Sequence, residues 1–520
     1  MTHDHVMRWR GWVAVAGALL VLLVLWTLHM ALAGDVAGLF HDEGEYLVAA
    51  RALASGLGYR ITSLPGAPPE VHYPPLFPLL LAAVWRAAPA FPSNLVALKA
   101  MPLLAAIGLV LLLPRYLVRV GVAPLAAGIT AVLTALAPLT LRYATAVVSE
   151  LPFTLLLVAT LLLIERAAEP GRPAGAAAVA GALAGLATLT RLVGIGLVAG
   201  GALVLLRRSG RRRAEAFALA AALVLVPWLT WLAAQPDAGV ALGYLGELEQ
   251  RGLTTPRELL AHLAGLPAVA TLVTIPGLAE VAPPAPPAVA VLLYLVGVGA
   301  LVLVLCGPAG IPVAASLALA VAWPLFQPRY VLPFAPLLLG ALLSALVPVD
   351  AGPARRAAGG AAGVALLVLA LAGQWTTLAQ VRASGLPALE QLPSARVRWD
   401  DLNLALAWLR ASTRPDDVLA NVHDPFVNLY TDRRTVRAYP ALRHADARQV
   451  TAILTRTHAS YLVDLPAPLG GGWTPAHHAW RRWLRQHRHS LTPVYASSTT
   501  RIRVWRIDGP LTTPNRLAAS

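Results

Sequence analysis

The sequence predicts a polytopic α-helical membrane protein that carries a small soluble α/β domain near its C-terminal end. The chain has 520 residues, of which 57% are hydrophobic and 13% charged, and its mean hydropathy is +0.65. A soluble domain has about 25% charged residues, so most of this chain requires a lipid environment. Apolar runs of about 20 residues, long enough to span the hydrocarbon core of a bilayer, recur until about residue 380.

The first apolar run covers residues 12–33 and follows the basic segment MTHDHVMRWR. A basic flank before an apolar run is also typical of a signal peptide, but a small-x-small cleavage site followed by polar residues is missing. We therefore predict a retained first transmembrane helix. Further spans bring the expected total to about eleven, and they lie at 94–113, 122–140, 150–164, 174–189, 192–206, 214–234, 286–306, 309–326, 330–348 and 358–378.

Arginines mark the loops that we predict to be cytoplasmic. Basic residues accumulate in the cytoplasmic loops of membrane proteins, and a cytoplasmic N-terminus satisfies this rule. These anchors account for most of the net charge of +15, so the charge predicts no nucleic-acid partner. The anchors are Arg115, Arg119, Arg166, Arg172, Arg207, Arg208, Arg211, Arg212, Arg213, Arg355 and Arg356.

Residues 174–206 allow two interpretations. One long tilted helix would leave Arg191 in lipid, where an unpaired cation is costly. A hairpin of two short helices would place Arg191 at its outer tip, which fits the charge pattern better. Arg191 would then be either the snorkelling end of a helix or a contact to a phosphate group.

The remaining segments divide the chain into two parts. Residues 1–380 form a membrane domain whose outer segments, 34–93 and 235–287, are too long to be simple connectors. An odd number of spans places the α/β domain, 381–510, outside the cytoplasm, followed by a tail at 511–520. In this domain DLNLALAWLRAST has helical periodicity, DDVLANV and ASYLVDL are typical of strands, and TPVYASSTTRIRVWRID is typical of a hairpin.

Acidic residues gather directly after the first apolar run, in HDEGEYLVAARALASG. Asp42 and Glu43 are adjacent, so on a helix their side chains point about 100° apart and only one of them faces a given ligand. They either belong to a site or stabilise a helix N-terminus. The apolar positions of this helix predict that it lies along the membrane surface, and YPPLFPLL is predicted to begin a helix that does not cross.

Four motifs in order resemble a known family. They are D-E-x-x-Y at 42–46 with P-P-L-F-P-L-L at 74–80, RYATAVVSELPF at 142–153, QPRYVLPFAPLL at 327–338, and AWLRAST with NLYTDRRTVRAY in the soluble domain. This arrangement resembles the family 39-like integral membrane glycosyltransferases of the C-type fold, whose relatives include protein O-mannosyltransferases and lipid A aminoarabinose transferases.

The resemblance implies a function. Such enzymes transfer a sugar from a polyprenyl-phosphate or diphosphate donor to a protein, lipid or polysaccharide acceptor, here at the outer face of a bacterial-type plasma membrane. A phosphate leaving group needs no general acid, so one carboxylate base and cations on the phosphate suffice, and one direct displacement inverts the anomeric centre. The resemblance assigns the base to Asp42, with Glu43 as the second candidate. An ordinary carboxylate is a poor base for a hydroxyl, so activity would require a raised pKa or a divalent cation such as Mg or Mn.

The same resemblance assigns further site residues. Glu150 orients the acceptor or shares a metal ion with Asp42; alternatively it is an ordinary helix N-terminal residue. Arg329 binds the donor phosphate, because a cation at a helix start near the membrane needs a partner. Arg51, Arg191 and Tyr46 are weaker candidates for binding the donor phosphate. Arg51 could instead anchor the chain to lipid headgroups.

Two departures narrow the substrate class. The aminoarabinose transferases have a lysine where this chain has Tyr73, and the soluble domain lacks a WWDYG-type sequence that would indicate an oligosaccharyltransferase. Two other functions stay open. One is a transporter or flippase for lipid-linked sugars, which would carry ionisable residues deep inside several helices. The other is a non-catalytic envelope-assembly protein.

Overall fold

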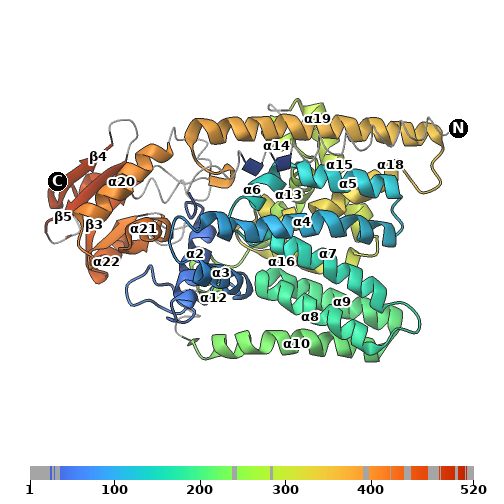
Figure 1. Ribbon diagram of the computed structural model, residues 1–520, viewed down its shortest axis with the longest axis horizontal. Coiled ribbons are helices and arrows are strands. Elements are labelled where there is room, and N and C mark those ends of the chain that lie inside the picture. The colour runs from blue at the N-terminus through green and yellow to red at the C-terminus, as the bar shows by residue number, and fades with distance from the viewer. Residues whose placement is uncertain are drawn as a thin grey trace.

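The protein consists of a helical bundle and a smaller unit of strands and helices at one end of it (Figure 1). The structure is a computed structural model that describes residues 24–25, 28–29, 36–236, 243–281, 285–390, 398–421, 423–437, 447–465, 480, 482–497, 502–509 and 511. The bundle helices are α4 (Leu95–Arg119), α5 (Pro124–Leu136), α6 (Pro138–Ala144), α7 (Glu150–Ala167), α8 (Ala174–Thr190), α9 (Ile195–Ser209), α10 (Arg211–Ala233), α13 (Pro256–Thr274), α15 (Pro287–Leu305), α16 (Gly310–Ala322), α18 (Ala335–Leu346) and α19 (Pro353–Ser384).

Several of these helices are able to span a membrane. Within the described residues six helical segments are long and apolar enough, and the pair α5–α6, bent by 56°, brings the number to seven. The chain is therefore a multi-pass membrane protein. The predicted number of about eleven is not confirmed, because α8 and α16 have only 17 and 13 residues and the predicted span 12–33 lies almost entirely outside the described residues.

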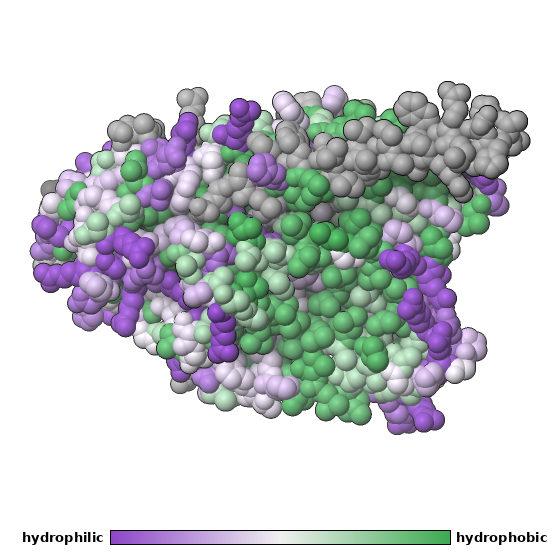
Figure 2. All heavy atoms as spheres, in the orientation of Figure 1, coloured by the Kyte–Doolittle hydropathy of each residue, from purple (hydrophilic) through white to green (hydrophobic). Residues whose placement is uncertain are grey.

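The surface of the bundle matches this assignment. Figure 2 shows a broad hydrophobic area over the middle of the bundle, between the hydrophilic C-terminal unit and a second hydrophilic end. Leucines on α4 and α10, such as Leu104, Leu111, Leu219 and Leu223, are more than half exposed. Soluble monomers rarely expose so much contiguous apolar surface, which indicates a lipid-facing belt.

Residues 174–209 form a helical hairpin. α8 ends at Thr190, Arg191 is extended (φ −147°, ψ 131°), and a short 3-10 turn at Leu192–Gly194 leads into α9. The structure therefore agrees with the predicted break at Arg191. Close packing of α8 on α10 depends on Gly181 and Gly185, since a Cβ on Gly181 would lie 2.0 Å from the carbonyl oxygen of Phe217. Small residues four apart allow membrane helices to approach closely.

The second outer segment differs from the prediction. Residues 256–274 form α13, which packs lengthwise against α15 in the bundle. Its first turn is polar and carries a capping box between Thr255 and Glu258, a pattern that suits an exposed helix start. Its second half is apolar and buried, so the helix begins outside the bundle and ends within it.

The first outer segment forms α2 (His41–Ala54) and α3 (Leu76–Ala87). Residues Glu43–Ala50 of α2 are buried, and α2 contacts both α3 and helix α21 (Asp424–Thr431) of the C-terminal unit. Its predicted position along the membrane surface stays a prediction. α3 has 12 residues, too few to cross a bilayer, as the sequence predicted.

The C-terminal unit contains a five-stranded sheet with the order β2-β1-β3-β5-β4. Its strands are β1 (Val418–Asn421), β2 (Arg434–Arg437), β3 (Ala459–Asp464), β4 (Leu491–Ala496) and β5 (Arg503–Ile507), and its helices are α20 (Trp399–Ser412), α21 (Asp424–Thr431) and α22 (Ala447–Arg456). β1 pairs in parallel with β2 and β3, whereas β5 pairs antiparallel with β3 and β4. The predicted helix, strands and terminal hairpin are all present, and β2, α21 and α22 were not predicted.

Replacing Gly181 by alanine tests the packing of α8 on α10. The added Cβ collides with backbone that cannot move away, and overpacking typically costs about 1–3 kcal/mol. We expect a lower midpoint of thermal unfolding in detergent. Gly175→Ala on the same helix is the control: a Cβ there meets no atom within 4 Å, and alanine is favoured over glycine in helices by about 0.5–1 kcal/mol. Equal effects of the two substitutions would contradict the packing described here.

Candidate functional site

Asp42 and Arg329 form a short ion pair at the end of the bundle that faces the C-terminal unit. Asp42 lies in the first turn of α2, and Arg329 lies in α17 (Pro328–Val331), which precedes α18. Nη1 of Arg329 donates to Oδ2 of Asp42 over 2.6 Å, and the two side chains are 15% and 14% exposed. The Arg329 guanidinium also lies over the ring of Phe40, 5.2 Å from its centroid. Charge-assisted hydrogen bonds shielded in this way are stronger than surface pairs.

A second ion pair lies beside the first. Glu150 is the first residue of α7 and is 1% exposed. Its Oε1 is 2.8 Å from Nη1 of Arg191 and 4.0 Å from Nη1 of Arg329. Two carboxylates and two guanidinium groups therefore form one cluster, built from four separate parts of the chain. Nε of Arg329 and Oε2 of Glu150 are buried and have no hydrogen-bond partner among the described residues, so the cluster has spare hydrogen-bonding capacity for a ligand.

Tyr46 lies one turn after Asp42 on α2 and closes one side of the cluster. Its hydroxyl is 2.9 Å from Oγ of Ser149, which also accepts a hydrogen bond of 3.1 Å from Nη1 of Arg191. The ring of Tyr46 packs edge-on against Tyr73, with 4.8 Å between the centroids. The predicted residues Asp42, Tyr46, Glu150, Arg191 and Arg329 thus meet in one place.

Glu43 points elsewhere. It is 1% exposed, and its two oxygens accept backbone N–H groups of Gly38, over 2.8 Å, and Val147, over 2.5 Å. The carboxylate therefore connects the segment before α2 to the segment before α7. With both oxygens engaged in this way, Glu43 is placed as a structural link, and Asp42 is the carboxylate that faces the arginines.

Arg51 lies about two and a half turns along α2 from Asp42 and contacts the C-terminal unit. It donates to Asp432, over 3.2 Å, and to Asn428. It also lines a cavity of about 500 Å³ between α3 and α20. The structure therefore places Arg51 at the domain interface and not in the cluster around Asp42.

The charges of the cluster set the state of Asp42. Burial alone would raise the pKa of Asp42, but the Arg329 guanidinium holds it below its ordinary value. Asp42 is therefore an anion at neutral pH and, while paired with Arg329, a weak proton acceptor.

A divalent cation does not fit between Asp42 and Glu150. Nη1 of Arg329 already lies within 4.0 Å of both carboxylates, and Arg191 adds a second positive charge. Metal ions of this type require oxygen ligands without a competing cation. Across the described part of the chain, no three His, Cys, Asp or Glu side chains come together in a way that would hold a metal ion.

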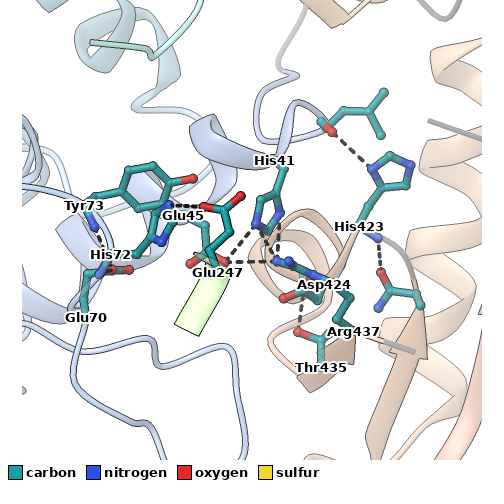
Figure 3. A network of polar contacts seen from close by, with 12 residues as sticks. His41, Glu45, Glu70, His72, Tyr73, Glu247, His423, Asp424, Thr435 and Arg437 are labelled. Carbon is teal, nitrogen blue, oxygen red and sulfur yellow. Dashed lines mark hydrogen bonds and ion pairs between the residues drawn. The ribbon is translucent and has the colours of Figure 1, made fainter. Parts of the chain in front are cut away.

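A further polar network joins α2 to the C-terminal unit (Figure 3). Arg437 at the end of β2 donates through Nε to Asp424 over 3.1 Å and contacts His41 and Glu45 of α2. Glu45 is 6% exposed, and its Oε2 has no hydrogen-bond partner among the described residues. Burial raises the pKa of Glu45, as do Glu70 and Asp424, whereas Arg437 opposes this rise.

Glu70 supports the loop in front of α3. Its Oε1 accepts backbone N–H groups of His72, over 2.8 Å, and Tyr73, over 3.1 Å. Burial raises the pKa of Glu70 to about 7, although these two hydrogen bonds oppose the rise. The ring of His72 packs against Tyr244, 4.3 Å between centroids. Tyr73, which replaces the lysine of the aminoarabinose transferases, is thus held at the wall of the cluster.

The sequence did not point to His41, Asp424 or Arg437 as site residues. Arg437 lies in NLYTDRRTVRAY, which carried the resemblance in the soluble domain, but nothing in that motif indicated which other segment it would meet. Glu45 was visible as a third acidic residue near Asp42, and its spacing of three placed it on the same face of α2.

Comparison with known proteins gives no match to a family model and no match to a curated sequence. Solved structures do match. The apo form of ArnT from Cupriavidus metallidurans, a lipid A aminoarabinose transferase, is similar with a TM-score of 0.57 and 14% identity, over 95% of this chain and 98% of that chain. The form bound to undecaprenyl phosphate has a TM-score of 0.53 and 16% identity over the same shares.

An archaeal protein has the same architecture. The oligosaccharyltransferase AglB from Archaeoglobus fulgidus, in complex with an inhibitory peptide and a dolichol-phosphate, matches with a TM-score of 0.53 and 16% identity, over 96% of this chain and 75% of that chain. At these identities the similarity concerns the fold. The chain therefore has the C-type fold of membrane glycosyltransferases, as its motifs predicted.

Proposed function

We propose that this protein transfers a sugar from a polyprenyl-phosphate donor to an acceptor at the extracytoplasmic face of the membrane, with inversion of the anomeric centre. The observation that carries this proposal is the buried cluster in which Asp42 and Glu150 meet Arg329 and Arg191. It combines one accessible carboxylate with two cations, which is the minimum set for attack by a hydroxyl on a sugar phosphate.

The phosphate group of the donor would bind to Arg329 and Arg191. Both guanidinium groups lie at helix starts or breaks near the end of the bundle, within reach of a headgroup whose lipid tail remains in the bilayer. The buried Nε of Arg329 has no hydrogen-bond partner in the described part of the chain, and a phosphate oxygen would satisfy it. Tyr46 would contribute through the Ser149 hydroxyl, and ArnT and AglB with bound polyprenyl and dolichol phosphates support this class of donor.

Catalysis would proceed in one displacement. The acceptor oxygen attacks the anomeric carbon, the bond from that carbon to the phosphate oxygen breaks, and its electron pair leaves with the phosphate. The proton of the acceptor hydroxyl goes to Asp42, and Glu150 orients the acceptor and holds Arg191. A bound phosphate competes for Arg329 and so weakens its hold on Asp42. The pKa of Asp42 would rise as a result, which makes it a better base only when the donor is present.

The orientation follows from the arginines. Arg207, Arg208, Arg211, Arg212 and Arg213 surround the α9–α10 connection, at the end of the α8–α9 hairpin away from Arg191. The positive-inside rule assigns that end to the cytoplasm. The cluster and the C-terminal unit would then face the outside of a bacterial-type plasma membrane, where a lipid-linked donor is needed because nucleotide sugars stay in the cytoplasm.

The distribution of buried charge favours an enzyme over a transporter or flippase. Among the described residues, the buried charged side chains lie in α2, in the loop before α3, at the fifth position of α4, at the first position of α7, in α14 (Leu278–Val281) and in the C-terminal unit. A transport pathway would place such groups midway along several spanning helices. A non-catalytic assembly protein remains the alternative that the following experiments address.

Asp42→Asn tests the catalytic base. The amide cannot take up the proton, so kcat for sugar transfer in proteoliposomes should fall by about 10²–10⁴-fold, with polyprenyl-phosphate binding retained. The matched control is Glu165→Gln: Glu165 is 11% exposed and paired with Arg208 at the other end of the bundle. We expect that control to stay within about two-fold of the wild type. Full activity of Asp42→Asn would exclude Asp42 as the base.

Arg329→Lys tests the phosphate contact. Lysine keeps the charge but loses the planar fork that binds a phosphate in two places. The KM for the donor should rise about 10-fold or more, and binding of polyprenyl phosphate alone should weaken in parallel. Arg208→Lys is the control, since it alters an arginine–carboxylate pair outside the cluster. If kcat of Arg329→Lys falls while donor binding is unchanged, Arg329 acts on Asp42 and does not bind the donor phosphate.

A further inference from the structure

The C-terminal unit contacts the segment before α2 and the first turn of α2 at several points. The backbone N–H of Ala37 donates to the hydroxyl of Tyr430 over 3.0 Å, and Nδ1 of His423 lies 3.2 Å from the carbonyl oxygen of Leu39. Gly44 lies directly against Pro425, because a Cβ on Gly44 would come within 2.7 Å of the Pro425 Cβ. Ala37 and Leu39 lie just before α2 and Gly44 lies in its first turn, so these contacts flank Asp42 on both sides along the chain.

That turn has no side-chain cap of its own. The N-cap residue is Phe40, whose side chain makes no capping hydrogen bond. Four N–H groups at a helix start lack intrahelical partners, and helices without a capping side chain lose about 1 kcal/mol. The direction in which Asp42 points therefore depends on contacts made by other parts of the chain.

From the C-terminal unit, Arg437 makes polar contacts with two residues of α2 close to Asp42. Its guanidinium holds Asp424 with Nε, and its Nη2 contacts the ring nitrogens of His41 and lies 3.7 Å from Oε1 of Glu45. His41 immediately precedes Asp42, and Glu45 follows it by three positions on the same helix face. Figure 3 shows Arg437 reaching from the C-terminal unit to both residues.

Arg437 meets a neutral imidazole at His41. Burial lowers the pKa of His41 to about 3, and Arg437 contributes to the shift. The imidazole is therefore neutral at pH 7 and accepts a hydrogen bond from the guanidinium. His41 and Glu45 also lie 3.4 Å apart, so the three side chains form a closed triangle around the first turn of α2.

We propose that the C-terminal unit is part of the catalytic apparatus, and that Arg437 is the positioning residue through which it directs Asp42 at Arg329 and the acceptor. Arg329 holds Asp42 from the bundle, and Arg437 holds the two neighbours of Asp42 from the soluble unit. This inference rests on the proposed role of Asp42 as the base. It gives the C-terminal unit a function in the chemical step rather than in substrate capture.

Arg437→Met in the full-length protein tests the inference. We expect kcat to fall about 10- to 100-fold, because a displacement of about 1 Å in a reacting group has effects of that size, while the donor KM stays within about three-fold. Arg437→Lys should restore part of the activity, since it keeps the charge but cannot reach Asp424 and His41 together. Arg434→Met is the matched control: Arg434 lies on the same strand and is exposed, so its kcat should remain within about two-fold.

Two further measurements separate positioning from general stability. Hydrogen–deuterium exchange in peptides covering residues 38–47 should increase in Arg437→Met and not in Arg434→Met. In the Asp42→Asn background, Arg437→Met should lower the residual kcat by less than about two-fold, because a residue that acts through Asp42 has nothing left to position.

The results distinguish two kinds of failure. Unchanged exchange at residues 38–47, a loss confined to the donor KM, or a full additional loss in the Asp42→Asn background would each overturn the role of Arg437. Full activity of Asp42→Asn would instead overturn the proposed function. If Arg437→Met does not fold, the exchange and kinetic comparisons are made with Arg437→Lys, for which unchanged exchange and kcat would equally overturn the inference.

Discussion

The ion pair between Asp42 and Arg329 is the interaction on which the rest of the site depends. It joins two parts of the chain 287 residues apart, and both side chains are shielded enough that neither charge would be stable alone. Three neighbouring features bring these two charges together. α2 begins at the end of the bundle, α17 places Arg329 directly before α18, and the ring of Phe40 lies against the Arg329 guanidinium. Each of these features serves to bring opposite charges together outside the apolar belt.

The ion pair between Glu150 and Arg191 also joins a buried carboxylate to a guanidinium, but it uses a helix start and a helix break. Glu150 is the first residue of α7, where the helix dipole favours a negative charge, and Arg191 reaches it from the break between α8 and α9. The regular helical hydrogen bonding is interrupted at this break, where Arg191 makes the ion pair with Glu150 and a hydrogen bond to Ser149. The two arginines repel each other, but each is paired with a carboxylate. An additional anion would therefore enter a region that already contains two fixed cations.

Much of the charged cluster could be predicted from the sequence, because charged residues are rare in this chain. In a chain that is 13% charged, Asp42, Glu150, Arg191 and Arg329 stand out at the ends of apolar runs, and they meet in the structure. The helix, strands and hairpin of the soluble domain followed from periodicity. Arg51 pairs with Asp432 of the C-terminal unit, a partner that the sequence around Arg51 could not indicate. His41, Asp424 and Arg437 formed no local pattern for the same reason, whereas Glu45 was visible as a third acidic residue near Asp42. α13 begins with a polar turn, although its second half is apolar, and so it fell within the predicted outer segment 235–287.

Glu43 has a consequence for how this segment can vary. Its carboxylate ties Gly38 to Val147, while its neighbour Asp42 faces Arg329, and the helix separates the two directions by about 100°. The rotation of α2 about its own axis is therefore fixed by two adjacent residues, Asp42 and Glu43, which make contacts in different directions. Inserting or deleting one residue within the first turn would rotate one of these carboxylates away from its partner, whatever residue was added. Substitution and length change are thus different perturbations here: a substitution alters one side chain, whereas a change of length alters the direction in which the following side chains of α2 point.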